Sequence, residues 1–129
     1  MTVNDYQKEA LKTDAMKGRS PREIVIFDPE RYNMMQRLQQ GLMGLCGEAG
    51  EAIDILKKHM FQGHEFTEDV REHLAKELGD VAWYLAVSAD ALGYSLETVL
   101  RMNVNKLRKR YPNGYFESEK SVERADGDV

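Results

Sequence analysis

Two pairs of acidic residues have the spacing needed to bind a multivalent cation. They are Glu48 with Glu51 and Glu77 with Asp80, and residues three apart on a helix project from the same side. Apolar residues flank each pair at helical spacing. Four carboxylates beside a hydrophobic face repel one another and resist burial unless a cation lies between them. Because oxygen ligands suit a hard ion such as Mg²⁺, the pairs indicate phosphate chemistry.

The spacing of these carboxylates is not specific by itself. Glu65 with Glu68, and Asp69 with Glu72, are also three apart, and they fit solvated residues at a helix start, where the helix dipole favours negative charge. The main pairs would equally fit the exposed edge of an amphipathic helix. The metal site is favoured because glycines flank both pairs and the pairs fall on successive predicted helices.

Composition limits the classes of function that the chain can have. With 129 residues and a net charge of −4, we expect one domain that binds neither a nucleic-acid polymer nor an anionic membrane through bulk charge. The single cysteine, Cys46, forms no internal disulfide, and zinc-ligand spacing is absent. The sequence shows no signal-peptide pattern, and its longest apolar run, residues 81–87, is too short to cross a bilayer. A cytoplasmic location is therefore expected.

Helix start and stop signals predict an all-α protein with a bundle of four to five helices. Prolines occur only at 21, 29 and 112, so residues 30–111 contain no strong breaker. We expect helices over residues 4–16, from 34 or 38 to 60, 68–92 and 95–110, with Asn4 and Ser95 as N-caps and Gly93 as a C-terminal stop. The Ile24–Phe27 run fits either a buried loop or a short extended piece. The domain covers residues 1–116, and the polar tail over 117–129 is expected to be disordered.

Glycines at 41, 44, 47 and 50 interrupt the second predicted helix. Each lowers helix propensity by about 1 kcal/mol relative to alanine. A helix that keeps them is expected to approach another backbone or a ligand closely.

Further polar side chains fall beside the acidic pairs when residues are placed at about 100° intervals around a helix. Tyr84 and His73 lie almost on the bisector of Glu77 and Asp80. Lys58 lies within about 50° of the bisector of the first pair. The fourth predicted helix carries Asn103, Lys106 and Arg110 on one stripe. Two acidic stripes and one cationic stripe could surround a metal-bound polyphosphate.

Each of these side chains also has a purely structural interpretation. On spacing alone, Tyr84 fits a core aromatic better than a base-stacking platform. The cations near Arg110 fit a last helical turn, where the dipole favours positive charge, as well as they fit phosphate contacts. The three histidines fit surface or hydrogen-bonded polar residues better than ligands.

Three motifs occur in the order of a known family. The segments Gly44–Ala52, Lys76–Leu85 and Asn103–Pro112 resemble the MazG-type all-α nucleotide pyrophosphohydrolases, and the resemblance covers about residues 4–115. The acidic signature of that family is EExxE followed by ExxD, and the two acidic pairs match four of its positions. Gly47 replaces the leading Glu, as in the GExGE branch that resembles the dCTP pyrophosphatases. This departure leaves the number of bound metal ions open.

The resemblance implies an all-α NTP pyrophosphohydrolase fold and an enzyme that cleaves a nucleoside triphosphate, preferably a deoxynucleotide, between the α and β phosphates. Monophosphate and pyrophosphate would be the products, Mg²⁺ the cofactor with Mn²⁺ as a substitute, and a homodimer or homotetramer the assembly. By position, the metal ligands and catalytic carboxylates would be Glu48, Glu51, Glu77 and Asp80. Glu51 is our choice for activating the attacking water. Tyr84 would pack on the base, and phosphate contacts or site ordering would come from Lys58, Asn103, Lys106 and Arg110. The motifs do not specify the base, the sugar, or whether damaged or normal nucleotides are cleaved.

Two other functions fit part of the pattern. A helical interaction protein could use the acidic stripe to bind a basic partner, and Mg²⁺ would then not raise its melting temperature. A di-iron bundle requires Glu-x-x-His pairs. The residues three before the histidines are Leu56, Phe61 and Val70, so the sequence disfavours it.

Overall fold

The computed structural model describes residues 2–14 and 28–122, and the regular secondary structure within these ranges is entirely helical. The predicted all-α class is therefore confirmed. The chain divides into two compact units, residues 1–33 and 34–129. None of the described helices combines the length and the apolar character needed to cross a membrane.

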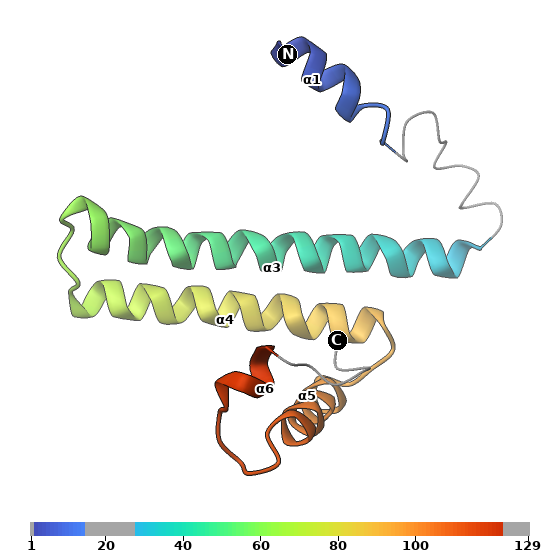
Figure 1. Cartoon of the computed structure of the whole chain (residues 1–129). Coiled ribbons are helices and arrows are strands. Elements are labelled where there is room, and N and C mark those ends of the chain that lie inside the picture. The colour runs from blue at the N-terminus through green and yellow to red at the C-terminus, as the bar shows by residue number, and fades with distance from the viewer. Residues whose placement is uncertain (1, 15–27, 123–129) are drawn as a thin grey trace. The chain divides into compact units, whose positions relative to one another are not determined.

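Helix α1 spans Val3–Ala10 (Figure 1) and begins earlier than predicted. Thr2 is its N-cap: Asp5 N donates to Thr2 Oγ1 at 3.1 Å, and Thr2 N donates to Asp5 Oδ2 at 2.8 Å. The predicted cap at Asn4 was wrong, because Thr2 and Asp5 form a reciprocal capping box that satisfies two backbone donors at once. The predicted helix reached residue 16, whereas α1 ends at Ala10. The Ile24–Phe27 run lies outside the described residues.

Helix α3 spans Pro29–Gln62 and also begins before the predicted start at 34 or 38. Proline is favoured in the first turn of a helix, where its missing N–H needs no partner. Asp28 helps to cap this end, since Arg31 N donates to Asp28 Oδ1 at 2.9 Å. At the other end, Gly63 has φ of 72°, a backbone conformation that suits glycine after a helix. The predicted end at residue 60 is confirmed to within two residues.

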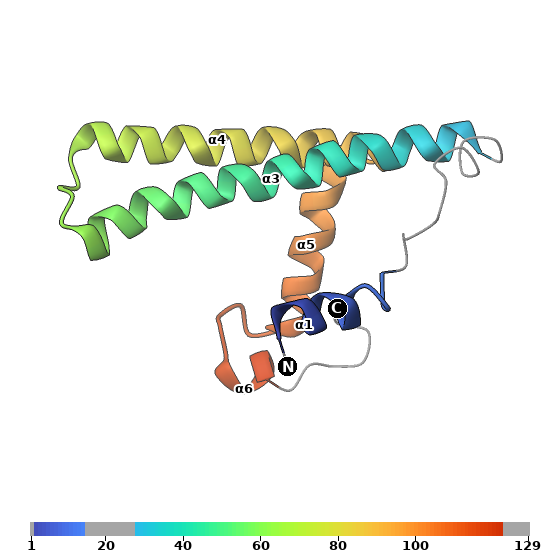
Figure 2. The same ribbon diagram turned by 90° about the horizontal axis from the view of Figure 1, so that it is seen from above.

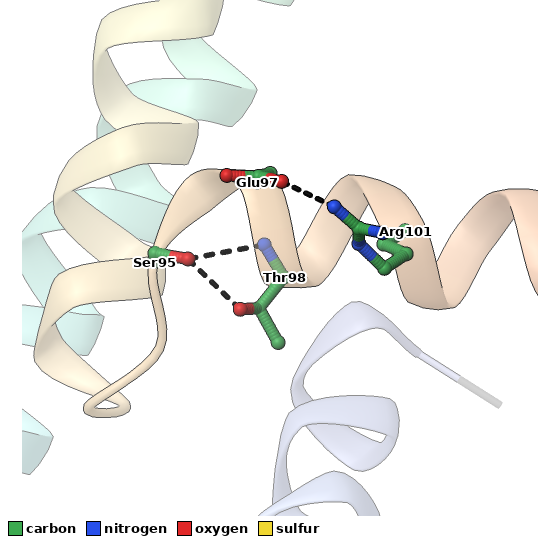
Figure 3. Close-up of polar contacts among 4 residues, drawn as sticks. All are labelled: Ser95, Glu97, Thr98 and Arg101. Carbon is green, nitrogen blue, oxygen red and sulfur yellow. Dashed lines mark hydrogen bonds and ion pairs between the residues drawn. The ribbon is translucent and has the colours of Figure 1, made fainter.

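Helices α4, Glu68–Ala91, and α5, Leu96–Arg110, match their predicted bounds to within a residue. Gly93, with φ of 77°, separates them. Figure 3 shows the start of α5, where Ser95 Oγ accepts from Thr98 N at 3.1 Å and Glu97 pairs with Arg101. In the tail predicted to be disordered, Ser118–Val122 forms the short helix α6.

Helices α3 and α4 form an antiparallel pair, seen side by side in Figures 1 and 2. A Cβ added at Gly41 would lie 2.3 Å from Ser88 Oγ, and one added at Gly44 would lie 2.2 Å from Tyr84 Cε1. The predicted close approach therefore occurs at these two glycines, although against side chains. At Gly47 and Gly50 an added Cβ would meet nothing within 4 Å.

The helical hairpin buries none of its large apolar side chains fully within the described residues. Among the described residues, the buried hydrophobic ones are Ala89 and Ala91. Exposed side chains along α3 and α4 include Leu42, Met43, Ile53, Leu78 and Trp83. Large exposed apolar side chains on two packed helices suit an interaction surface.

Candidate metal and substrate site

The α3/α4 hairpin brings three carboxylates together at its middle. One oxygen each from Glu48 and Glu51 of α3 and from Glu77 of α4 lie within 4.8 Å of one another. Oxygen ligands of Mg²⁺ lie at about 2.0–2.1 Å, so two opposite ligands are about 4.2 Å apart. A small contraction of the three side chains would therefore fit them around one ion.

Burial differs among the three carboxylates. Glu77 is buried, with 7% of its surface exposed, whereas Glu48 is half-buried and Glu51 is exposed. Burial raises the pKa of Glu48, and the neighbouring charges of Glu51 and Asp80 and a hydrogen bond with Glu77 raise it further. Negative charge is thus crowded at this point. A divalent cation would relieve that repulsion.

Asp80, the fourth predicted ligand, is exposed. It does not belong to the set of mutually close ligand atoms found among the described residues. Its charge nevertheless acts on Glu48. The structure therefore brings three of the four predicted carboxylates together and leaves Asp80 at the edge of the group.

His73 contacts the buried carboxylate directly. Its Nε2 lies 2.9 Å from Glu77 Oε1. The sequence places His73 on the same helical side as Glu77 and predicts a surface or hydrogen-bonded polar residue there. The spacing of four residues, which puts two side chains one helical turn apart, was the signal that could have identified the pair.

Tyr84 packs against α3 at Gly44 and is half-buried. Trp83, which is exposed, meets its ring edge-on, with ring centroids 4.8 Å apart. The glycine and the tyrosine thus occupy complementary positions on the two helices. An aromatic surface lies one helical turn beyond Asp80.

The predicted phosphate-binding cations are not gathered at the carboxylates within one chain. Lys58 pairs with Asp54 at 2.7 Å, and hydrogen bonds from Lys57 and Lys58 lower the pKa of Asp54 to about 2. Helix α5 carries the exposed Asn103 and the half-buried Lys106 and Arg110. Helix α4 runs on for about 21 Å beyond Glu77 before the chain turns into α5, and α5 leads away from the hairpin (Figure 2).

The MazG nucleotide pyrophosphohydrolase domain matches residues 36–115, more than half of the chain and a span that contains the three clustered carboxylates. The chain belongs to the MazG family. This MazG domain is also 42% identical over 76 residues to the Gene 37 protein of Mycobacterium phage L5, covering 58% of this chain and 67% of that protein. No solved structure matches the chain. Membership in the family supports nucleotide pyrophosphohydrolase activity in general.

Proposed function

We propose that this MazG-family chain is a Mg²⁺-dependent nucleotide pyrophosphohydrolase that cleaves a nucleoside triphosphate, preferably a deoxynucleotide, between the α and β phosphates. Monophosphate and pyrophosphate are its products. The observation that carries the proposal is the convergence of Glu48, Glu51 and Glu77 from two helices to within 4.8 Å. So much negative charge around one point suits a divalent cation that in turn binds a triphosphate.

The carboxylates have two roles, cation binding and orientation of the attacking water. Glu48, Glu51 and Glu77, with Asp80 at the edge, hold the cation, for which Mn²⁺ can substitute. When bound, the ion neutralises phosphoryl oxygens and lowers the pKa of a coordinated water. Glu51 orients the attacking water, because its carboxylate is the exposed member of the three and has room to accept a hydrogen bond from it.

The remaining predicted residues bind the substrate. Tyr84 packs on the base. The packing of its ring against Gly44 supports a fixed ring position. Lys58 leaves its ion pair with Asp54 and binds a phosphate oxygen instead. Because α5 leads away from the hairpin (Figure 2), we propose that a second copy of the chain brings its α5 residues, Asn103, Lys106 and Arg110, to the phosphates.

We propose a homodimer or homotetramer because α3 and α4 expose large apolar side chains. A unit in which Ala89 and Ala91 are the described hydrophobic residues that are fully buried has little core to offset the conformational entropy lost on folding. A second copy that covers Leu42, Met43 and Leu78 supplies the missing core. Sedimentation should find no stable folded monomer, and a well-folded monomer would contradict the assembly.

Pyrophosphate release from a panel of ribo- and deoxynucleoside triphosphates, with Mg²⁺ and with EDTA, tests the activity. Glu77→Gln should lower turnover by more than about 100-fold, since changes in the outer shell of a metal site alone lower activity 10–100-fold. Glu72→Gln is the matched control, because Glu72 is an exposed α4 residue that pairs with Lys76 outside the cluster. If no nucleotide shows metal-dependent turnover, the enzyme proposal fails. A helical interaction protein, whose melting temperature Mg²⁺ does not raise, is then favoured.

A further inference from the structure

The proposed function leaves His73 of α4 without a role, although His73 contacts the most buried carboxylate of the cluster. Its Nε2 lies 2.9 Å from Glu77 Oε1. The His73 side chain is 63% exposed, whereas that of Glu77 is 9% exposed. At this separation Nε2 can donate a hydrogen bond to the carboxylate when the ring proton is on that nitrogen, because an ionised carboxylate only accepts.

His73 touches the cluster without joining it. The ligand atoms that lie within 4.8 Å of one another belong to Glu48, Glu51 and Glu77, and the imidazole is not in that set within the described part of the chain. Oε1 of Glu77 lies against the ring, and the carboxylate has a second oxygen that can face a cation.

We propose that His73 is a positioning residue that orients the Glu77 carboxylate for divalent cation binding. This inference rests on the proposed function, because it requires a cation among the three glutamates. The terminal torsion of glutamate is broad, so an unsupported carboxylate samples many orientations. An N–H held at one oxygen fixes the carboxylate plane and directs the other oxygen toward the ion.

Hydrogen-bond partners of metal ligands contribute about 10–100-fold to metal affinity. Because the His73 side chain is 63% exposed and solvent weakens the contact, we expect the lower end of that range, about 10-fold. The contact is local to one turn of α4. Its loss should therefore leave the helical content of the protein unchanged.

Binding of Mn²⁺ alone to the full chain, followed by the EPR signal of the free ion, tests the inference. His73→Ala should weaken binding about 10-fold, and His73→Gln, which restores an N–H donor one turn from Glu77, should recover most of that loss. Arg71→Ala is the matched control. It removes the exposed Arg71–Glu68 pair of 3.2 Å on the same helix and should bind Mn²⁺ as the unaltered chain does.

The outcomes separate the two proposals. If the unaltered chain binds no Mn²⁺, the proposed function and the role of His73 fail together. If it binds Mn²⁺ and His73→Ala binds equally well, only the role of His73 is overturned. Equal weakening by His73→Gln and His73→Ala would overturn the hydrogen-bond basis of that role.

A second measurement uses the unaltered chain and does not depend on how a variant folds. Long-range ¹H–¹⁵N NMR near neutral pH should find His73 with its proton on Nε2, and addition of Mg²⁺ should shift that signal. The signals of His59 and His64, which contact each other through His59 Nδ1 and the His64 carbonyl at 3.0 Å, should stay in place. A His73 proton on Nδ1 alone, or a His73 signal unmoved by Mg²⁺ that does bind, would overturn the inference.

Discussion

Replacing Gly44 with alanine tests the contact that joins α3 to α4 beside the candidate site. The new Cβ would lie 2.2 Å from Tyr84 Cε1, 2.3 Å from Cζ and 2.5 Å from Cδ1. Ordinary contact between carbon atoms is about 3.5–4.0 Å, so the ring must move by more than about 1 Å. Tyr84 is also held by Trp83, whose ring meets it edge-on.

Two opposing effects set the size of the change. Forcing an extra methyl group into a packed contact destabilises a protein by about 1–3 kcal/mol. Replacing a helical glycine with alanine stabilises the helix by about 1 kcal/mol. We therefore expect Gly44→Ala to lower the free energy of unfolding by about 0–2 kcal/mol. In a Tyr84→Ala background the clash is absent, and Gly44→Ala should instead raise that free energy by about 1 kcal/mol.

Urea unfolding of the unaltered chain, Gly44→Ala, Tyr84→Ala and the double variant measures this reversal of sign. The protein concentration is the same in all four experiments. Gly47→Ala is the matched control, since an added Cβ there meets nothing within 4 Å, and its effect should be equal in both backgrounds. If Gly44→Ala has the same effect with and without Tyr84, the two residues are not in contact. The antiparallel register of α3 and α4 would then be refuted at this point.

Three further predictions concern charge. Mg²⁺ at 100 times its dissociation constant should stabilise the protein by about 2.7 kcal/mol, and Glu77→Gln should abolish this shift in thermal unfolding while Glu72→Gln keeps it. Because the folded pKa of Glu48 is raised above its ordinary 4.5, its contribution to stability is full below that value and is lost as pH rises through the folded pKa. Urea unfolding in EDTA should show this loss, and Mg²⁺ should suppress it; a loss equal in both would argue against a cation at the cluster. Because the folded pKa of Asp54 is lowered from 3.8 to about 2, its contribution is present above 3.8 and is lost as pH falls toward 2. Asp54→Asn should remove that part of the acid sensitivity, and an unchanged acid titration would contradict the pairing with the two lysines.

Local signals account for the parts of the fold that were predicted well. Gly93 and Ser95 bound α4 and α5 because a helix ends and begins through contacts within a few residues. The errors at α1 and α3 were also local. The capping box of Thr2 and Asp5, and not Asn4, begins α1. Helix α3 begins at Pro29, whereas the predicted start was residue 34 or 38. Both starts are therefore encoded by residues within one turn of the helix end.

The sequence by itself determined the all-helical class, the order of the acidic motifs and the family to which they belong, because spacing along one helix needs no knowledge of its neighbours. Only the tertiary structure decided that Glu77 meets Glu48 and Glu51 while Asp80 stays at the edge. It also distinguished Gly44, which receives Tyr84, from Gly47, which receives nothing within the described chain. These facts depend on how far α3 is displaced along α4. That register is set by side-chain packing between segments more than 25 residues apart, which periodicity within either helix does not encode.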